Sequence, residues 1–339
     1  MSRSSACFEL IQDIQKRSEG FFTVVQLCRI LEVSRSGYYR WLQAAEDRAL
    51  REEQDRADFS LILEAYQAHG RFKGARAIAM ELAHRSEGAV IMNVKKIRRL
   101  MKKFHLECPI RKANPYRRLA KALRTSHVAS NHLKREFEQN GPRSVLLTDI
   151  TYIPYNGRFA YMSTILDAYT KEILAYRVSD SLEVDFVLET VRDLMEHHGD
   201  SLQTNALIHS DQGCHYTSTA FIKLVRSKKL RQSMSRRGNC WDNAPQESFF
   251  GHMKDEIRDR LAGCICFEDV KALLDEQIDY YNNYRYQWKL ARLAPSEFYR
   301  YIQTGIYPIE GVQIPKHLVS PAKSAKQDSS CLSSENEQL

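Results

Sequence analysis

Residues 145–155 form an apolar run that restricts the folds open to this chain more than any other stretch. The run is rich in Val, Leu, Ile, Thr and Tyr and stays apolar at both alternating sets of positions, which predicts a central strand buried on both faces of a sheet. Asp149 stands in its middle. A carboxylate is costly to bury there without a partner, so either hydrogen bonds or a metal ion must compensate it.

Beyond residue 155 the chain alternates between strand and helix patterns, after a domain boundary at Gly141-Pro142. The predicted strands are residues 159–166, 172–178, 206–209 and 230–234. The predicted helices are residues 184–197 and 218–228, a third that starts near 243, a fourth at 267–281 and a short one from 295. The order βββαβαβα, with the central strand first, is that of an RNase H-like fold of the α/β class.

Two further acidic residues are expected close to Asp149. Asp211 follows the fourth strand, which pairs beside the central one, and neither strand carries a Lys or Arg. Glu247 lies on the third helix, where 3.6 residues per turn place it on one face with Lys254 and Arg258. Taken alone, such a helix face is ordinarily solvated and has no role.

Three carboxylates from two strands and a helix suit hard divalent cations, which take oxygen ligands and keep positions for phosphate oxygens and water. Two such ions roughly 3.5–4 Å apart can activate a nucleophilic oxygen and stabilise the leaving oxygen of a phosphoryl transfer. We therefore predict a metal site at Asp149, Asp211 and Glu247. Two other acids nearby, Asp167 and Asp242, are interpreted as structural.

Positive charge is concentrated in one segment of a chain whose net charge is +8. Between Arg71 and Arg143 there are 19 Lys and Arg against 5 Glu and no Asp, a local charge of +14 that leaves −6 for the remainder. This asymmetry indicates a polyanionic partner. Nucleic acid is favoured over an acidic membrane surface because no amphipathic anchor accompanies the charge.

Helical patterns precede the α/β domain. Residues 23–43 predict two short helices joined by a tight turn, with Ser34 capping the second, in the outline of a helix-turn-helix; an ordinary helical hairpin is an equal alternative. A second helical unit follows, with helices around residues 59–66 and 75–82.

The third helix of this second unit, capped by Asn93, carries an apolar stripe, and cations without any acid cover the rest of its surface. This favours DNA contact over a merely solvated basic helix. The cations predicted to bind DNA are Lys95, Lys96, Arg98, Arg99, Lys102 and Lys103.

The predicted domain organisation follows from these patterns and from a basic, proline-containing stretch that suits a linker along a phosphate backbone. The expected parts are a helix-turn-helix-like unit at residues 1–50, a second one at 51–106, a basic linker at 107–140, the catalytic core with C-terminal helices at 141–300 and a partly disordered tail at 301–339.

Composition excludes several classes. No apolar run is long enough to span a bilayer and the start lacks the apolar core of a signal peptide, so we expect a cytoplasmic protein with no membrane partner. The eight cysteines are scattered without a CxxC pair, which indicates reduced thiols. A zinc site, including one built on His127 and His132, is disfavoured for the same reason.

The motifs around the acids resemble those of one family. Residues 147–152 (Leu-Thr-Asp-Ile-Thr-Tyr) and 209–213 (His-Ser-Asp-Gln-Gly) are similar to the two Asp motifs of the DDE transposases of bacterial insertion sequences. Residues 242–250 are similar to their Glu motif, with the family's 35 residues between Asp211 and Glu247. From about residue 20 to 300 the chain resembles the second-reading-frame product of the IS-three family, whose catalytic domain is the retroviral-integrase core.

Further matches and some departures lie outside these motifs. Lys254, seven residues after Glu247, matches the family's basic residue on that helix. The other matching positions are residues 33–39, residues 281–285, Leu290 and Pro295. The departures are Cys214, His215 and Gln287, which concern only the fine positioning of the substrate.

The resemblance implies a transposase that uses two Mg²⁺ or Mn²⁺ ions to cut DNA at the element's ends and to join the freed 3′-hydroxyl to DNA. Its ligands would be Asp149, Asp211 and Glu247, with Asp149 between the two ions, and Lys254 would hold the terminal DNA. The implied partners are double-stranded DNA, as terminal inverted repeats and target, further copies in a homo-oligomer, and an upstream-frame protein or frameshift fusion. The implied location is bacterial and nucleoid-associated.

Two other interpretations stay open from the residues. A metal-dependent nuclease of the same fold would hydrolyse DNA without joining it, because the sequence does not distinguish water from a 3′-hydroxyl as the nucleophile. A DNA-binding regulator would use the helical units beside an inactive core. The intact set of three acids argues against the regulator.

Overall fold

The computed structural model describes residues 3–17, 21–70, 72–86, 88–109, 141–235 and 243–309. Most of the predicted linker, most of the predicted tail and Asp242 lie outside these residues. The helices of the N-terminal part are α1 (Arg3–Arg17), α2 (Val24–Ile30), α3 (Arg35–Gln43), α4 (Ala45–Gln67), α5 (Ala75–Ala83) and α6 (Val94–Lys103). Within the described ranges, no helix combines the length and apolar character needed to cross a membrane.

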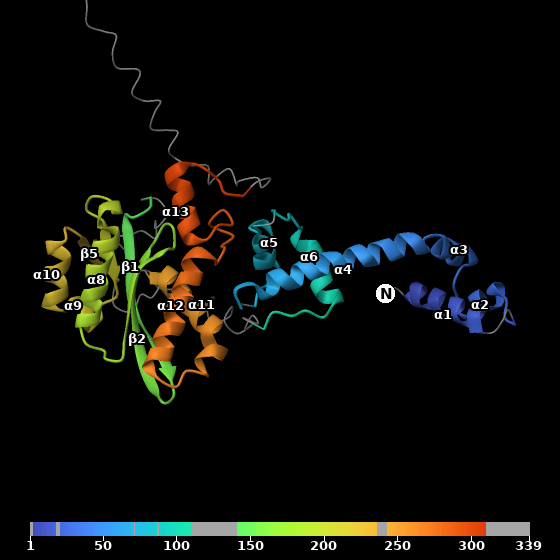
Figure 1. The fold of residues 1–339 in the computed structure, drawn as a ribbon, viewed down its shortest axis with the longest axis horizontal. Coiled ribbons are helices and arrows are strands. Elements are labelled where there is room, and N and C mark those ends of the chain that lie inside the picture. Colours follow the sequence, from blue (N-terminus) through green and yellow to red (C-terminus); the bar gives the residue numbers. More distant parts are fainter. Residues whose placement is uncertain are drawn as a thin grey trace, which may run out of the picture.

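The C-terminal part is the α/β domain (Figure 1). Its strands are β1 (Val145–Tyr155), β2 (Arg158–Asp167), β3 (Ile173–Ser179), β4 (Leu207–Ser210) and β5 (Arg231–Met234). Its helices are α8 (Asp185–His198), α9 (Cys214–Thr217), α10 (Thr219–Ser227), α11 (Ala244–Leu261), α12 (Phe267–Asn283) and α13 (Pro295–Thr304). The predicted order of strands and α-helices in this domain is confirmed, and the single turn of α9 was not anticipated.

β1 is the central strand, as predicted. The sheet order is β3-β2-β1-β4-β5, in which β1 pairs antiparallel with β2 and parallel with β4. Leu146 and Leu147 are both fully buried although they point to opposite faces of the sheet. The mixed sheet is that of an RNase H-like domain, so the predicted fold class is confirmed.

A separate hydrophobic core covers each face of the sheet. α11 and α12 pack on one face, with Phe249, Met253 and Ile278 in the core that contains Leu147. α8 and α10 pack on the other face, in the core that contains Leu146. Figure 1 shows the two pairs of helices on either side of β1. The helix that carries Glu247 is thereby held against the central strand.

α2 and α3 have the predicted helix-turn-helix outline, and both are capped by hydroxyl side chains. Thr23 Oγ1 accepts the N–H of Gln26 at 3.3 Å, and Ser34 Oγ accepts the N–H of Gly37 at 3.1 Å. α1, which the sequence patterns did not reveal, packs against both helices. Their shared core consists of Phe8, Ile11, Leu27, Cys28 and Tyr38.

The second helical unit is built on α4, which is longer than predicted. α4 runs unbroken through residue 50, where the first predicted unit ends, so the two units share this helix (Figure 1). α5 and α6 pack on its C-terminal half around a core that includes Ile62, Ile78 and Leu100. Asn93 caps α6 as predicted, because its Oδ1 accepts the N–H of Lys95 at 2.8 Å.

Side chains of the second helical unit also contact the C-terminal part of the α/β domain. The imidazole of His84 stacks on Tyr286 with ring centroids 3.7 Å apart, and its Nε2 lies 3.3 Å from Glu297 Oε2. The ring of His69 lies 4.6 Å from that of Tyr284. These contacts seat the helical unit beside the C-terminal end of α12 and the start of α13.

Candidate active site

Asp149 lies in the middle of β1, opposite Thr164 of β2 in the antiparallel register. Side chains alternate along a strand, so Asp149 shares the sheet face of Leu147, which packs in the core beneath α11. Its Oδ1 accepts the N–H of Ile150 at 2.8 Å. One oxygen of the predicted metal ligand is therefore engaged with its own strand.

Asp211 directly follows β4, the parallel neighbour of β1. The buried imidazole of His209 braces this strand end, since its Nδ1 lies 3.0 Å from Ser233 Oγ and its Nε2 lies 3.0 Å from Ser235 Oγ. Gln212 Nε2 donates to the carbonyl of Ser235 at 3.0 Å. These bonds hold the end of β4 against β5 and so position Asp211 beside the central strand.

Glu247 lies in the first turn of α11, where a proline at the helix start suits the missing amide proton. Glu247 and Lys254 are exposed on one side of this helix. The opposite side packs on the sheet through Phe249, Phe250, Met253 and Ile257, all of them buried. The two faces predicted for this helix are confirmed.

Two polar side chains tie the start of α11 to the strands around Asp149. Asn243 Nδ2 donates to the carbonyl of Thr148 at 3.5 Å, a long hydrogen bond. Gln246, which is fully buried, donates through Nε2 to Thr164 Oγ1. Thr164 is the cross-strand neighbour of Asp149. Gln246 therefore connects the residue opposite Asp149 with the helical turn that carries Glu247.

The role of this glutamine was not predicted from the sequence. Gln246 falls on the apolar stripe of α11, four residues before Phe250 and seven before Met253. A polar residue on a buried helix face needs a hydrogen-bond partner inside the protein, and that was the available signal. Asn243 was expected only as a helix cap; it stands at the cap position, but its side chain forms no capping bond there.

The acidic groups influence one another electrostatically. The pKa of Asp149 is raised to about 7, mainly by burial; the negative charges of Asp211 and Glu247 add to the rise, and the hydrogen bond from Ile150 and the charge of Lys254 oppose it. Partial desolvation at the protein surface also raises the pKa of Glu247, although its side chain is largely exposed. Partial desolvation lowers the pKa of Lys254, and the charge of Asp149 opposes this shift. The structure therefore brings the three predicted carboxylates and Lys254 into one region.

The residues fit a divalent cation in charge and in donor type. Three carboxylates supply the oxygen ligands that Mg²⁺ and Mn²⁺ take, and a cation among them would relieve their mutual repulsion. As the side chains stand, no group of three His, Cys, Asp or Glu in the described part of the chain lies close enough to enclose an ion. Asp149 and Asp211 each turn Oδ1 to a backbone N–H, at Ile150 and Gly213, so both carboxylates would reorient to bind.

Replacement of Gln246 by Leu is expected to lower activity roughly 10- to 100-fold, the effect typical of residues that orient metal ligands. The variant loses the hydrogen bond to Thr164 and keeps a side chain of similar size, so we expect the fold to persist. The loss should appear mainly as a higher Mg²⁺ concentration for half-maximal activity. Asp259→Asn, a change at an exposed acid on the same helix, is the control, and an equal Mg²⁺ requirement in both variants would contradict the assigned role.

The predicted DNA-binding residues fall in two places. Lys254 lies close enough to Asp149 for their charges to interact. The other six lie on α6, in the second helical unit. Three of these six, Lys96, Arg99 and Lys103, form ion pairs with acids of α4.

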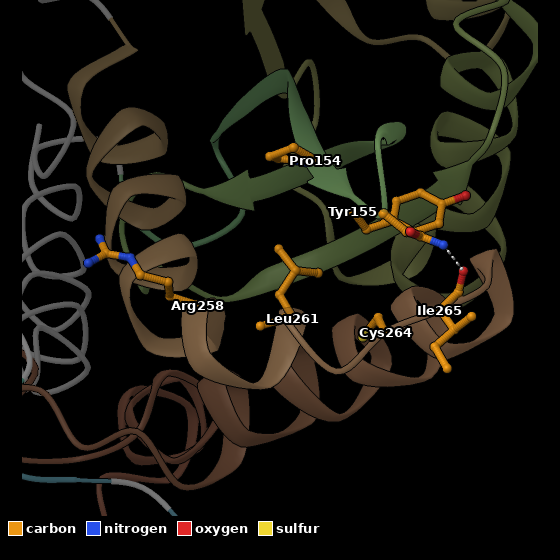
Figure 2. Close-up of a pocket in the computed structure, with 8 residues that line it drawn as sticks. Pro154, Tyr155, Arg258, Leu261, Cys264 and Ile265 are labelled. Atoms are coloured by element: carbon orange, nitrogen blue, oxygen red, sulfur yellow. Dashed lines mark hydrogen bonds between the residues drawn. The ribbon is translucent and has the colours of Figure 1, made fainter.

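A pocket of about 400 Å³ lies at the far end of α11, beside the turn between β1 and β2 (Figure 2). Pro154 and Leu261 line it, and Asn156 Nδ2 donates to the carbonyl of Ile265 at 3.2 Å. Figure 2 shows Arg258 extending away from the hairpin. None of the three predicted carboxylates lines this pocket, so it is separate from the candidate active site.

Family models match the described domains. The model of an integrase core domain matches residues 139–240, and a second integrase core model matches residues 228–295. The model of an HTH-like domain matches residues 53–114. The catalytic domain is therefore an integrase core, preceded by a unit of helix-turn-helix type.

Curated relatives decide the family. The putative transposase InsK for insertion sequence element IS150 of Escherichia coli (strain K12) is 32% identical over 82% of this chain and 94% of its own length. The transposase InsF for insertion sequence IS3A of the same organism is 26% identical over 84% of this chain and 96% of its own. The chain belongs to the IS-three family of DDE transposases. Another match to this transposase is the insertion element IS600 uncharacterized 31 kDa protein of Shigella sonnei, 30% identical over 80% of this chain and 97% of that protein.

Solved integrase structures are similar to parts of this transposase, at lower sequence identity than the curated relatives. The catalytic core domain of BIV integrase matches with a TM-score of 0.39 and 15% identity, over 48% of this chain and 97% of that one. The simian T-cell lymphotropic virus intasome in complex with PP2A regulatory subunit B56 gamma matches with a TM-score of 0.44 and 14% identity, over 76% of this chain and 77% of that one.

Proposed function

We propose that this transposase cuts DNA at the ends of an insertion sequence and joins the freed 3′-hydroxyl to a second DNA, with two Mg²⁺ or Mn²⁺ ions as cofactors. Asp149, Asp211 and Glu247 are the proposed metal ligands. The observation that carries the proposal is that the sheet and α11 bring these three acids together, so that Asp211 and Glu247 both raise the pKa of Asp149. When bound, the ions would activate the attacking oxygen and stabilise the leaving oxygen.

The protein's own groups have defined tasks in this proposal. α11 and the end of β4 hold their carboxylates around the central strand, so the ligands come from three rigid elements. Gln246 and Asn243 keep the start of α11 in register with the strands. Lys254, exposed on the Glu247 side of α11, would contact a phosphate or base of the terminal DNA.

The proposed partners are double-stranded DNA as element ends and as target, together with further copies of the chain. Both ends of an element must be cut and joined together, which favours a dimer or a larger assembly. An upstream-frame protein, separate or fused by frameshifting, is a further proposed partner in the bacterial nucleoid.

The test combines the full chain, Mg²⁺, a labelled duplex with an element end and a plasmid target. Labelled DNA covalently joined to the plasmid is the expected product. Cleavage of the end without joining would instead favour a metal-dependent nuclease of the same fold. DNA binding with neither cleavage nor joining under all metal conditions would favour a regulator with an inactive core.

A further inference from the structure

The basic helix α6 carries its six cations in two stripes with different surroundings. At about 100° per residue, positions 95, 98 and 102 fall on one line along the helix, and positions 96, 99 and 103 fall on another about a quarter turn away. The buried side of the helix, with Ile97, Leu100 and Met101, faces the core of the helical unit. Both stripes lie outside the buried side; the first (the outward stripe) faces solvent, and the second (the flanking stripe) lies on the side of the helix next to α4.

The flanking stripe is paired with acids of α4. Arg99 forms two hydrogen bonds to Asp55, of 2.8 and 2.6 Å, and Lys103 Nζ lies 2.8 Å from Asp55 Oδ2. Lys103 also pairs with Glu52, and Lys96 pairs with Asp58. The partners run in opposite order along the two helices, so α4 and α6 are antiparallel where they meet.

These ion pairs favour the charged forms of their members. Hydrogen bonds from Arg99 are the main reason that the pKa of Asp55 lies well below its ordinary value. The same contact raises the pKa of Arg99, and bonds to Asp55 and Glu52 raise that of Lys103. If a DNA phosphate paired with one of these cations, the carboxylate of α4 would lose its partner and would lie beside the negative charge of the phosphate. The acids of α4 therefore oppose DNA on this flank.

The outward stripe has no such partners. Lys95, Arg98 and Lys102 are all exposed, and their side chains form no ion pair or hydrogen bond with any part of the chain that the structure describes. They span two turns of the helix in a single line. Such a line of unpaired cations is complementary to a row of phosphates along one DNA strand.

We infer that Lys95, Arg98 and Lys102 are the residues through which α6 binds the DNA backbone. Lys96, Arg99 and Lys103 instead form ion pairs with α4 and fix the orientation of α6. The inference deepens the proposed function and rests on it, because it assumes that this transposase binds duplex DNA. It divides a helix that looks uniformly basic in sequence into a contact stripe and a positioning stripe. The ligand class is the sugar-phosphate backbone of duplex DNA, without sequence preference.

Salt dependence of binding tests the division, because each phosphate contact releases condensed counterions. The full chain is titrated with a random-sequence duplex of about 30 base pairs in EDTA, at NaCl concentrations from about 50 to 200 mM. Loss of three phosphate contacts in Lys95→Gln/Arg98→Gln/Lys102→Gln should reduce the slope of log K against log salt by about 2.7. The melting temperature of this variant should equal that of the wild type.

The matched variant is Lys96→Gln/Arg99→Gln/Lys103→Gln, which removes the same charge from the same helix. Its slope should equal that of the wild type. If this variant fails to fold, a version that also carries Glu52→Gln, Asp55→Asn and Asp58→Asn removes the unpaired acids and takes its place. Equal slope reductions in the two sets, or no reduction in the first, would overturn the inference.

Failure of the inference and failure of the proposed function give different results. If the wild type joins DNA ends but the first variant keeps the full slope, the contact stripe is wrong and the transposase assignment of activity stands. If the wild type binds duplex DNA with the expected slopes but never joins ends, the inference stands and the proposed reaction does not.

Discussion

Replacing Glu247 by Gln is expected to reduce DNA joining about a thousand-fold, because a metal ligand contributes several kcal/mol of transition-state stabilisation and each 1.4 kcal/mol is a factor of ten. The amide keeps the size of the side chain and loses only its charge. Glu247 is exposed in the first turn of α11, so its replacement disturbs no core packing. Folding and DNA binding should therefore remain as in the wild type.

The measurement is the joining assay with labelled ends, run beside DNA-binding titrations on the same preparations. Asp259→Asn, at an exposed acid further along α11, removes the same charge away from the strands and should join DNA at the wild-type rate. Undiminished joining by Glu247→Gln would remove this residue from the catalytic site. Loss of DNA binding in that variant would mean that its charge serves the fold or the interface instead.

Asp149→Asn is expected to stabilise the metal-free protein at neutral and higher pH. The pKa of Asp149 is raised to about 7 in the folded chain, mainly by burial, against an ordinary value of 3.8. The folded state thus binds the proton more tightly than the unfolded state, so the contribution of this group to stability is fully present below about pH 4 and is lost as pH rises through about 7. A shift of about three pKa units corresponds to about 4 kcal/mol, and partial exposure of the side chain reduces this to about 2–4 kcal/mol.

Chemical denaturation of the full chain in EDTA, at about pH 5 and about pH 8, measures this contribution. The wild type should lose stability between the two values, and Asp149→Asn should lose less, by roughly 60% of the amount given above, because part of the change falls below about pH 5. Asp180→Asn, a change at an exposed aspartate of the same domain, should keep the wild-type pH dependence. Identical pH dependence of Asp149→Asn and the wild type would contradict the assigned burial of this charge. Mg²⁺ should restore stability to the wild type at pH 8 and not to Asp149→Asn.

The sequence predicted the catalytic fold well because its local signals agree with its tertiary structure. The apolar run at residues 145–155 forms β1 with the predicted bounds, and residues 145–148 are buried on both faces, whereas Tyr152 and Pro154 in its second half are exposed. Proline and polar residues mark the start of α11, and the two faces of that helix follow from its periodicity. These signals act within a few residues of one another, so pattern alone is enough to place them.

Contacts between distant residues were not available from pattern. α4 was expected to begin late, after a charged stretch, because nothing local indicates that Asp55 and Asp58 pair with a helix some forty residues further on. The bond of Gln246 to Thr164 likewise depends on the β1–β2 register and on how α11 crosses the sheet. α1 is another case, since its apolar face becomes meaningful only against α2 and α3.

In the candidate site too, local patterns predicted the residues but not the contacts between them. The identities of Asp149, Asp211 and Glu247 follow from motif and spacing, whereas their mutual influence follows from the order of strands in the sheet. Their present side-chain orientations, with Oδ1 of both aspartates on backbone N–H groups, could not have been predicted. A bound cation supplies the attraction that would turn them, and sequence patterns carry no information on rotamers.

Manganese binding tests most directly whether the three acids form one metal site. Isothermal titration with Mn²⁺ at about pH 8, where Asp149 is ionised, compares the wild type with Asp149→Asn, Asp211→Asn and Glu247→Gln. The wild type should bind Mn²⁺, each variant should bind it at least about tenfold more weakly, and Asp259→Asn should match the wild type. Wild-type affinity in any one of the three variants would exclude that residue from the site and contradict the central claim.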